Sequence, residues 1–270
     1  MSKLAAVVLV VALLLAPSLI LAQGDETPTS TVTPTPGTSI PGETLTPTPD
    51  ATATAEAASD TNIVRTVGSD GKSLYGDFYL LDVAQPTVLL LHQLYTDRSS
   101  WAVLIGPLLA SGRNVLAVDL RGHGATKGAI DWQMAVEDVQ AWLDWLRFEA
   151  GVRANAISMI GSSMGSSLAL VGCANDWGCP TAIAISPGWS YYGVYVEQSF
   201  TEKFDTRPVL LVLTESDHWP SLGVPRMVEA AKNPVTVETY EGNAHGMSLF
   251  DVYGTELTPL ILEWLATYGG

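Results

Sequence analysis

Basic side chains are scarce in this chain. Its 270 residues include 13 Lys and Arg against 28 Asp and Glu, so the net charge at pH 7 is −15. Nucleic acids, and membrane surfaces rich in anionic lipids, attract proteins mainly through basic side chains. The composition therefore argues against both as partners, and it says little about the fold.

Charged residues are also missing from most of residues 1–22. After Lys3, an apolar run of 19 residues without a charge extends from Leu4 to Ala22. The small residue Ala22 before a polar one is typical of a secretory signal, which predicts cleavage after Ala22. The run is also long enough to span a bilayer, so an uncleaved anchor is the alternative. Both interpretations predict a protein that is secreted or tethered to the outer face of the cell membrane, because Lys3 favours the inner side.

Residues 23–59 lack aromatic side chains, Lys and Arg. They contain 11 Thr and 6 Pro, a composition that cannot bury a hydrophobic core. Such Thr/Pro tracts are extended and often carry O-linked sugars outside the cell. We therefore expect a disordered linker over residues 23–59 and one folded domain over residues 60–270.

Cysteine is almost absent. The two cysteines, Cys173 and Cys179, are separated by five residues. In an exported protein a disulfide between them is the expected state. Free structural thiols are an alternative, whereas a metal or redox site is disfavoured because a metal would need more ligands nearby. No metal or other cofactor is predicted.

Apolar runs alternate with amphipathic segments across the predicted domain. The predicted strands are residues 62–67, 73–81, 87–91, 114–120, a segment from Ile157, 181–185, 209–213 and 235–240; the predicted helices are residues 99–111, 131–148, a small-residue segment after Ser163, 224–232 and 257–268. This alternation predicts an α/β fold with a mostly parallel central sheet and helices on both faces. An active site is expected at the carboxyl ends of the strands.

Ser163 lies at the centre of a Gly-x-Ser-x-Gly pattern, between an apolar run and a run of small residues. A strand, a sharp turn and a helix in this order hold the serine at the carboxyl end of a sheet, next to the helix N-terminus. Gly161 and Gly165 are expected there because a Cβ atom would meet the neighbouring strand or helix. The pattern by itself is common, and a serine that merely caps a helix is the alternative interpretation.

The order of these motifs resembles the α/β-hydrolase family over essentially all of residues 60–270. The family carries its nucleophile, acid and base in the order Ser, Asp or Glu, His. The resemblance implies an α/β-hydrolase fold in which these residues are Ser163, Asp217 and His245. Asp217 and His245 each follow a predicted strand, as their counterparts do in the family.

These residue types suit acyl transfer. A serine hydroxyl becomes a strong nucleophile only when an imidazole removes its proton, and a carboxylate on the other ring nitrogen fixes the tautomer and stabilises the charged ring. Glu215 is an alternative acid, and Asp217 could instead cap the next helix. His245 is the predicted base. The other three histidines are interpreted as structural hydrogen-bonding residues or as a rim residue: His92, His123 and His218.

Acyl transfer also needs N–H donors for the oxyanion. The resemblance implies the backbone N–H groups of Met164, which follows the nucleophile, and of Leu94, in the loop after the strand at residues 87–91. The family commonly has His-Gly-x in that loop, whereas this chain has Gln93 in place of the glycine. Gln93 is expected either to reach the site or to fold over the loop.

The resemblance implies a serine hydrolase that cleaves an ester or a related acyl bond through an acyl-enzyme, and the N-terminal apolar segment predicts that it is extracytoplasmic. The lid region between residues 185 and 209 is short, which favours a small, soluble ester or lactone and the dienelactone-hydrolase-like and small esterase-like members. An aminopeptidase-like amide hydrolase and a catalytically inactive surface binding module are the alternatives. The expected partner is a small-molecule substrate, with a membrane reached only through an N-terminal anchor; the oligomeric state is left open.

Overall fold

The computed structural model describes residues 62–270. The predictions for residues 1–22 and 23–59, and for the first two residues of the predicted domain, fall outside the described residues. Among the helices of residues 62–270, none has both the length and the apolar character needed to cross a bilayer.

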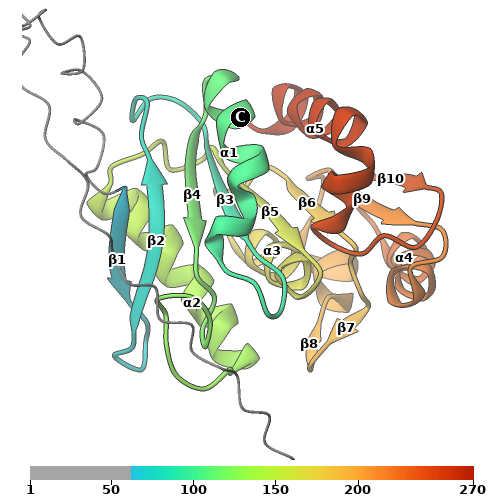
Figure 1. The fold of residues 1–270 in the computed structure, drawn as a ribbon, viewed down its shortest axis with the longest axis horizontal. Coiled ribbons are helices and arrows are strands. Elements are labelled where there is room, and N and C mark those ends of the chain that lie inside the picture. Colours follow the sequence, from blue (N-terminus) through green and yellow to red (C-terminus); the bar gives the residue numbers. More distant parts are fainter. Residues whose placement is uncertain (1–61) are drawn as a thin grey trace, which may run out of the picture. The chain divides into compact units, whose positions relative to one another are not determined.

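Eight strands form one sheet in the order β1-β2-β4-β3-β5-β6-β9-β10 (Figure 1). Their bounds are β1 Ile63–Val67, β2 Ser73–Tyr79, β3 Thr87–Leu91, β4 Asn114–Val118, β5 Ile157–Ser162, β6 Ala182–Ile185, β9 Val209–Thr214 and β10 Val235–Tyr240. β2 pairs antiparallel with both β1 and β4, and every other neighbouring pair is parallel. The mostly parallel sheet predicted from the sequence is therefore confirmed.

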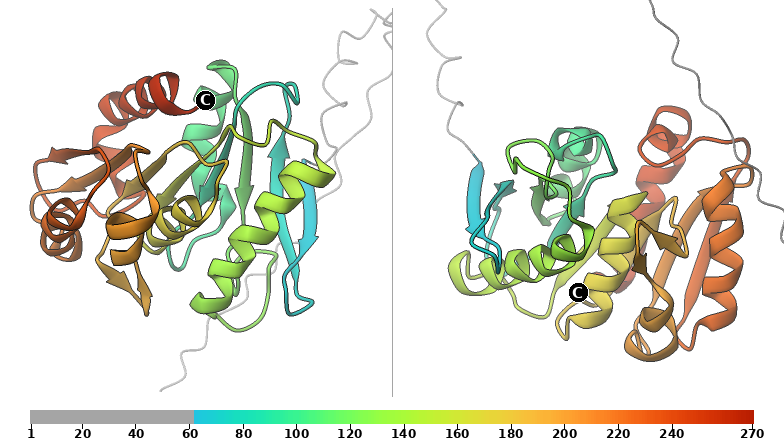
Figure 2. Two further views of the ribbon diagram at one scale, coloured as in Figure 1. Left: turned by 180° about the vertical axis from the view of Figure 1, so that it is seen from behind. Right: turned by 90° about the horizontal axis from the view of Figure 1, so that it is seen from below.

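Helices cover both faces of this sheet (Figures 1 and 2). Their bounds are α1 Ala102–Ala110, α2 Trp132–Asp144, α3 Met164–Asn175, α4 His218–Ala230 and α5 Ser248–Tyr268. Buried side chains of α1 and α5 pack in one hydrophobic cluster, and those of α2, α3 and α4 pack in a second cluster. Shorter elements are the 3₁₀ turn η1 Arg98–Trp101, the π turns η2 Trp145–Glu149 and η3 Ser199–Lys203, and the small hairpin of β7 Ser190–Tyr191 and β8 Val194–Tyr195.

The continuous apolar runs of the central strands follow from this double covering. Successive side chains of a strand point to opposite faces. In β3, Val88 and Leu90 join the cluster with α1 and α5, whereas Leu89 and Leu91 join the cluster with α2 and α3. Both faces of the strand are buried, so neither face can be polar.

The last two helices begin earlier than the sequence pattern indicates. α4 begins at His218 rather than at residue 224, and α5 begins at Ser248 rather than at residue 257. Pro220 lies in the first turn of α4, where no intrahelical N–H is needed. In α5, Tyr253 has non-helical backbone angles (φ −121°, ψ 17°), so a kink separates a first short helical segment from the segment that was predicted.

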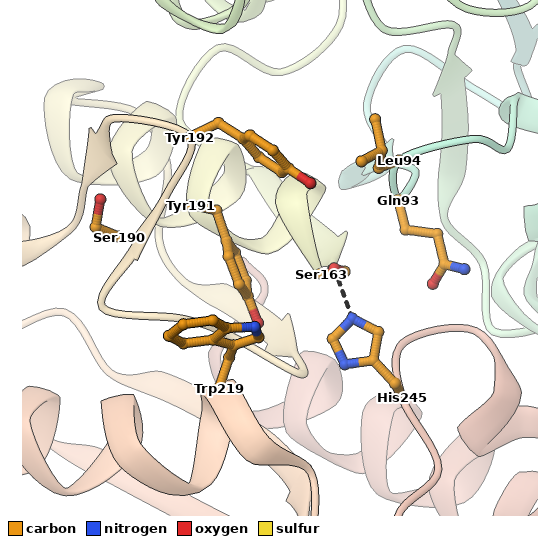
Figure 3. A pocket seen from close by; sticks show the side chains of 8 residues that line it. All are labelled: Gln93, Leu94, Ser163, Ser190, Tyr191, Tyr192, Trp219 and His245. Carbon is orange, nitrogen blue, oxygen red and sulfur yellow. Dashed lines mark hydrogen bonds between the residues drawn. The ribbon is translucent and has the colours of Figure 1, made fainter. Parts of the chain in front are cut away.

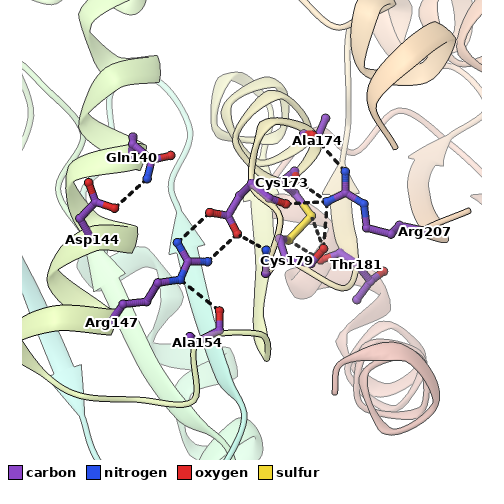
Figure 4. A network of polar contacts seen from close by, with 11 residues as sticks. Gln140, Asp144, Arg147, Ala154, Cys173, Ala174, Cys179, Thr181 and Arg207 are labelled. Carbon is purple, nitrogen blue, oxygen red and sulfur yellow. Dashed lines mark hydrogen bonds and ion pairs between the residues drawn. A yellow bond between two sulfur atoms is a disulfide. The ribbon is translucent and has the colours of Figure 1, made fainter. Parts of the chain in front are cut away.

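Cys173 and Cys179 form the predicted disulfide, with a Cα–Cα distance of 5.2 Å (Figure 4). The guanidinium of Arg207 donates to the carbonyl oxygens of Cys173, Ala174 and Cys179. These contacts provide partners for carbonyls at the end of α3, which have none within the helix. The disulfide and Arg207 therefore hold the carboxyl end of the helix whose amino end follows Ser163.

Candidate active site

Ser163 lies between β5 and α3 in a backbone conformation that L-residues rarely adopt, with φ 50° and ψ −115°. Its N–H donates to the carbonyl of Ile185 at the end of β6 (2.8 Å). A conformation of this kind costs free energy and persists only where the surroundings enforce it. The turn thus presents the Ser163 hydroxyl beyond the carboxyl end of β5, as the sequence pattern predicts.

The two glycines of the pattern have the predicted steric role. A Cβ atom at position 161 would lie 2.0 Å from the carbonyl oxygen of Gly165, and one at position 165 would lie 2.1 Å from the carbonyl oxygen of Leu91. Both neighbours are backbone atoms, which cannot rotate away as a side chain can. Close approach of α3 to β5 and to the end of β3 therefore requires glycine at both positions.

Ser163, His245 and Asp217 form a continuous chain of hydrogen bonds. His245 Nε2 lies 2.7 Å from Ser163 Oγ, and His245 Nδ1 lies 2.8 and 2.9 Å from the two carboxylate oxygens of Asp217. Since an ionised carboxylate accepts only, Nδ1 carries the proton and Nε2 is free to accept from the serine hydroxyl. The bond between Ser163 and His245 is drawn in Figure 3.

The structure brings Asp217, and not Glu215, to the imidazole. Asp217 is buried at the position that precedes α4, and its side chain makes no capping bond to that helix. Glu215 is exposed and lines a separate groove beside α4 and β10. In this structure Asp217 bonds His245 and does not cap α4, and Glu215 makes no hydrogen bond or ion pair with His245.

The loop that carries His245 is held at several successive positions by hydroxyl groups. The Thr214 hydroxyl, at the end of β9, donates to the carbonyl of Ala244 (2.9 Å). The N–H of His245 donates to Ser248 Oγ (2.9 Å), and the N–H of Gly246 donates to Ser186 Oγ (2.8 Å). We call residues 244–248 the base loop.

His92 and His123 are hydrogen-bonded and buried, as expected. His92 accepts from the N–H of Leu120 through Nε2 (2.9 Å), and burial lowers the pKa of His92 to about 4, so the ring is neutral at physiological pH. His123 donates through Nδ1 to the carbonyl of Arg121 (3.0 Å). Ser163 Oγ is hydrogen-bonded to His245 instead.

A cavity of about 430 Å³ lies beside the Ser163 hydroxyl. Tyr191, Tyr192 and Trp219 lie to one side of Ser163, and Gln93 and Leu94 lie to the other (Figure 3). The full lining consists of Gln93, Leu94, Ser163, Ser190, Tyr191, Tyr192, Trp219 and His245. Among the residues that the structure describes, no Asp, Glu, Lys or Arg lines this cavity.

Comparison with known proteins agrees with this architecture. The family model described as alpha/beta hydrolase fold matches residues 86–184, which include β3, β4, β5, all but the last residue of β6, and the Ser163 turn. The esterase Pf2001 of Pyrococcus furiosus has a similar structure, with 24% sequence identity, a TM-score of 0.66, and coverage of 78% of this chain and 94% of that one. The chain has the α/β-hydrolase fold.

Two further solved structures are similar to this chain. The dienelactone hydrolase of Anabaena variabilis ATCC 29413 is 17% identical, with a TM-score of 0.62 over 77% of this chain and 99% of that one. The esterase domain of a Rhodothermus marinus protein is also 17% identical, with a TM-score of 0.62 over 77% of this chain and 98% of that one. No curated protein matches this sequence.

The two positions expected to donate to an oxyanion differ in their surroundings. Leu94 lines the cavity next to Ser163. Met164 is the first residue of α3, where a backbone N–H has no carbonyl within the helix to bind. Its side chain is buried in the core and does not line the cavity. The role of both N–H groups stays a prediction.

The aromatic wall of the cavity was not predicted. Tyr191 and Tyr192 come from the β7–β8 hairpin in the short lid region, and Trp219 comes from the first turn of α4. Tyr191 donates its hydroxyl to the carbonyl of Ser186 (3.1 Å), and burial, together with the charge of Asp217, raises the pKa of Tyr191 well above its usual value. The dense aromatic sequence around Tyr191 was the available signal, but it did not show which rings face Ser163.

Proposed function

We propose that the protein is an extracytoplasmic serine hydrolase that cleaves an ester or related acyl bond of a small molecule. The observation that carries the proposal is the hydrogen-bonded chain from Ser163 through His245 to Asp217, at a strained turn that borders a cavity. A helix-capping serine needs neither a histidine nor a buried carboxylate behind it. Activation of a serine hydroxyl needs both.

Each residue has a defined role in the proposed reaction. His245 Nε2 removes the proton of Ser163 while Oγ attacks the acyl carbon, and the Nδ1–H bond to Asp217 stabilises the imidazolium that forms. The tetrahedral intermediate then collapses, His245 protonates the departing alcohol, and an acyl-Ser163 ester remains. Water, deprotonated by His245, attacks this ester. As the second tetrahedral intermediate collapses, the imidazolium returns the proton to Ser163 Oγ and the carboxylic acid leaves.

The cavity favours a small and neutral substrate. Its volume of about 430 Å³ is in the lower part of the usual range for ligand sites, roughly 300–1,000 Å³. Aromatic side chains form one wall, and none of the eight lining residues is acidic, Lys or Arg. Burying a charged substrate group here would leave that charge unpaired, which is costly.

Two features support a location outside the cytoplasm. The apolar run of residues 4–22 has the composition of an export signal or anchor. The Cys173–Cys179 disulfide suits an oxidising compartment. In this proposal, the Thr/Pro-rich segment serves as the spacer between the export segment and the enzyme.

Hydrolysis of p-nitrophenyl esters of increasing acyl length tests the proposed activity, with a p-nitroanilide as the amide control. We expect the highest kcat/KM for short acyl chains and a fall of kcat on the order of 10⁴-fold or more in Ser163→Ala. Ser69→Ala, at an exposed hairpin turn, is the control and should match the wild type. Faster cleavage of the anilide would favour the amide hydrolase, and equal turnover by Ser163→Ala would refute the nucleophile.

A further inference from the structure

Gln93 occupies a fixed position between the β3 strand and the cavity. Its backbone carbonyl accepts from Nδ1–H of His92 (2.7 Å) and from the hydroxyl of Thr96 (2.8 Å). The lowered pKa keeps the His92 ring neutral, so Nε2 accepts from the N–H of Leu120 and the ring proton lies on Nδ1. The backbone of Gln93, from which its side chain extends, is therefore held in place by hydrogen bonds.

The side chain of Gln93 connects this loop to the base loop. Its Oε1 atom accepts from the N–H of Met247 (2.8 Å) and from the hydroxyl of Ser162 (3.2 Å). Figure 3 places the amide next to His245, on the side away from Tyr191 and Trp219. One side-chain oxygen thus joins the loop after β3, the end of β5 and the loop that carries the predicted base.

Gly246, which precedes Met247 in the base loop, leaves room for the contact between Gln93 and Met247. Gly246 has φ +59°, and a Cβ atom there would lie 2.0 Å from Gln93 Oε1. The absence of a side chain at position 246 is therefore needed for the amide oxygen to approach Met247. The glycine that the α/β-hydrolase family commonly has where this chain has Gln93 could not make this contact, because it has no side chain.

We propose that Gln93 is a positioning residue for His245, an inference that rests on the proposed function. His245 belongs to a loop, and its side chain is 39% exposed, so its orientation depends on how the backbone of that loop is held. Thr214, Ser186 and Ser248 hold residues 244–246, and Gln93 holds Met247. Gln93 also precedes Leu94, the expected oxyanion donor, so its bond to Met247 connects the loop of that donor to the base loop.

Replacement of Gln93 by Met removes the hydrogen-bond acceptor Oε1 and keeps a side chain of nearly the same length. The variant loses Oε1 and leaves the Met247 N–H without this partner, so His245 samples orientations away from Ser163. We expect kcat to fall about 10-fold or more and KM to change less, because the lost contact aligns the base, whereas Gln93 is only one of the eight residues that line the cavity. Gln198→Met, which removes an exposed glutamine on another element, is the control and should retain wild-type kcat and KM.

Replacement of Gln93 by Glu distinguishes positioning from a merely structural role. The carboxylate keeps an acceptor for Met247 and Ser162, so kcat should recover toward the wild-type value at high pH. Its negative charge next to the imidazole favours the protonated ring. The inflection of the kcat/KM profile should therefore move to higher pH in Gln93→Glu, and Gln93→Met should show no such upward shift.

A double-mutant comparison tests the contact with Gly246. Gly246→Ala should reduce kcat more in the wild type than in Gln93→Gly, because the glycine removes the atom that the new Cβ would meet, while the strain of the positive φ is the same in both backgrounds. Equal losses would contradict the contact.

The inference fails if Gln93→Met keeps wild-type kcat, or if Gln93→Glu leaves the pH inflection unchanged. If Gln93→Met does not fold, the Gln93→Glu profile decides the question alone. If Ser163→Ala is inactive while the Gln93 variants keep wild-type activity, only the role of Gln93 is overturned. An inactive wild type would instead overturn the proposed function.

Discussion

The Ser163 turn and the base loop are held in place by different means. Backbone contacts fix the turn: a Cβ atom at Gly161 would meet backbone atoms of α3, and one at Gly165 would meet backbone atoms at the end of β3. Side-chain hydrogen bonds from distant elements fix the base loop, and the Met247 contact to Gln93 spans 154 positions of the sequence. A steric requirement for glycine at two positions produces a short sequence pattern that can be recognised. Separate hydrogen bonds between distant residues produce no such pattern.

This difference explains which parts of the site the sequence could predict. Ser163 was predicted from its own neighbours, because only glycine permits the approach of α3 to β5. The positions of Asp217 and His245 were predicted from their order after the strands that the α/β-hydrolase resemblance supplied. The contacts that orient His245 were not predicted. Ser186 carries no signal in the sequence, and Gln93 was expected to reach the site or to fold over the loop, but its partner Met247 could not be identified before the strands were placed side by side.

The first prediction concerns a substitution that disrupts the close backbone packing at the Ser163 turn, and it has the largest expected effect. Gly165→Ala places a Cβ atom 2.1 Å from the carbonyl oxygen of Leu91, and neither backbone can yield without moving α3 or β3. The free energy of unfolding, measured by urea titration, should fall by at least about 4 kcal/mol.

Gly254→Ala is the matched control for this substitution. Position 254 lies in α5, and a Cβ atom there meets no other atom within 4 Å. Since alanine favours a helix over glycine, this change should leave stability the same or raise it by up to about 1 kcal/mol. Equal behaviour of the two variants would contradict the steric account of the turn.

The second prediction removes the carboxylate behind the base and leaves the turn intact. Asp217→Asn should lower kcat roughly 10⁴-fold, because the amide no longer favours the tautomer that accepts the serine proton. The loss of the negative charge should also move the inflection of kcat/KM to lower pH. Steady-state kinetics between pH 5 and pH 9 measure both effects.

Glu215→Gln provides the comparison for the acid. Glu215 is exposed and lines a different groove, so its removal should leave the rate and the pH inflection almost unchanged. A large loss in Glu215→Gln together with normal behaviour of Asp217→Asn would show that the acid is misassigned.

The fold was more predictable than the cavity. Strands such as β3 are apolar along their whole length because both faces are covered, which is a property of the local sequence. The early start of α4 depends on Pro220 lying in a first turn, and the kink at Tyr253 lies between two helical segments of α5. Three aromatic side chains lie beside Ser163 because the β7–β8 hairpin and the start of α4 come together in space: Tyr191, Tyr192 and Trp219. The spacing of residues in the sequence does not predict this arrangement.

The central claim is that Ser163 is an activated nucleophile. Treatment of the intact protein with a fluorophosphonate, followed by peptide mass spectrometry, measures this directly, because an activated serine reacts rapidly with the reagent and an ordinary serine does not. The account predicts rapid stoichiometric labelling at Ser163, much slower labelling in Asp217→Asn, and none in Ser163→Ala. Absence of an adduct in the wild type, or an adduct on another residue that persists in Ser163→Ala, would contradict it.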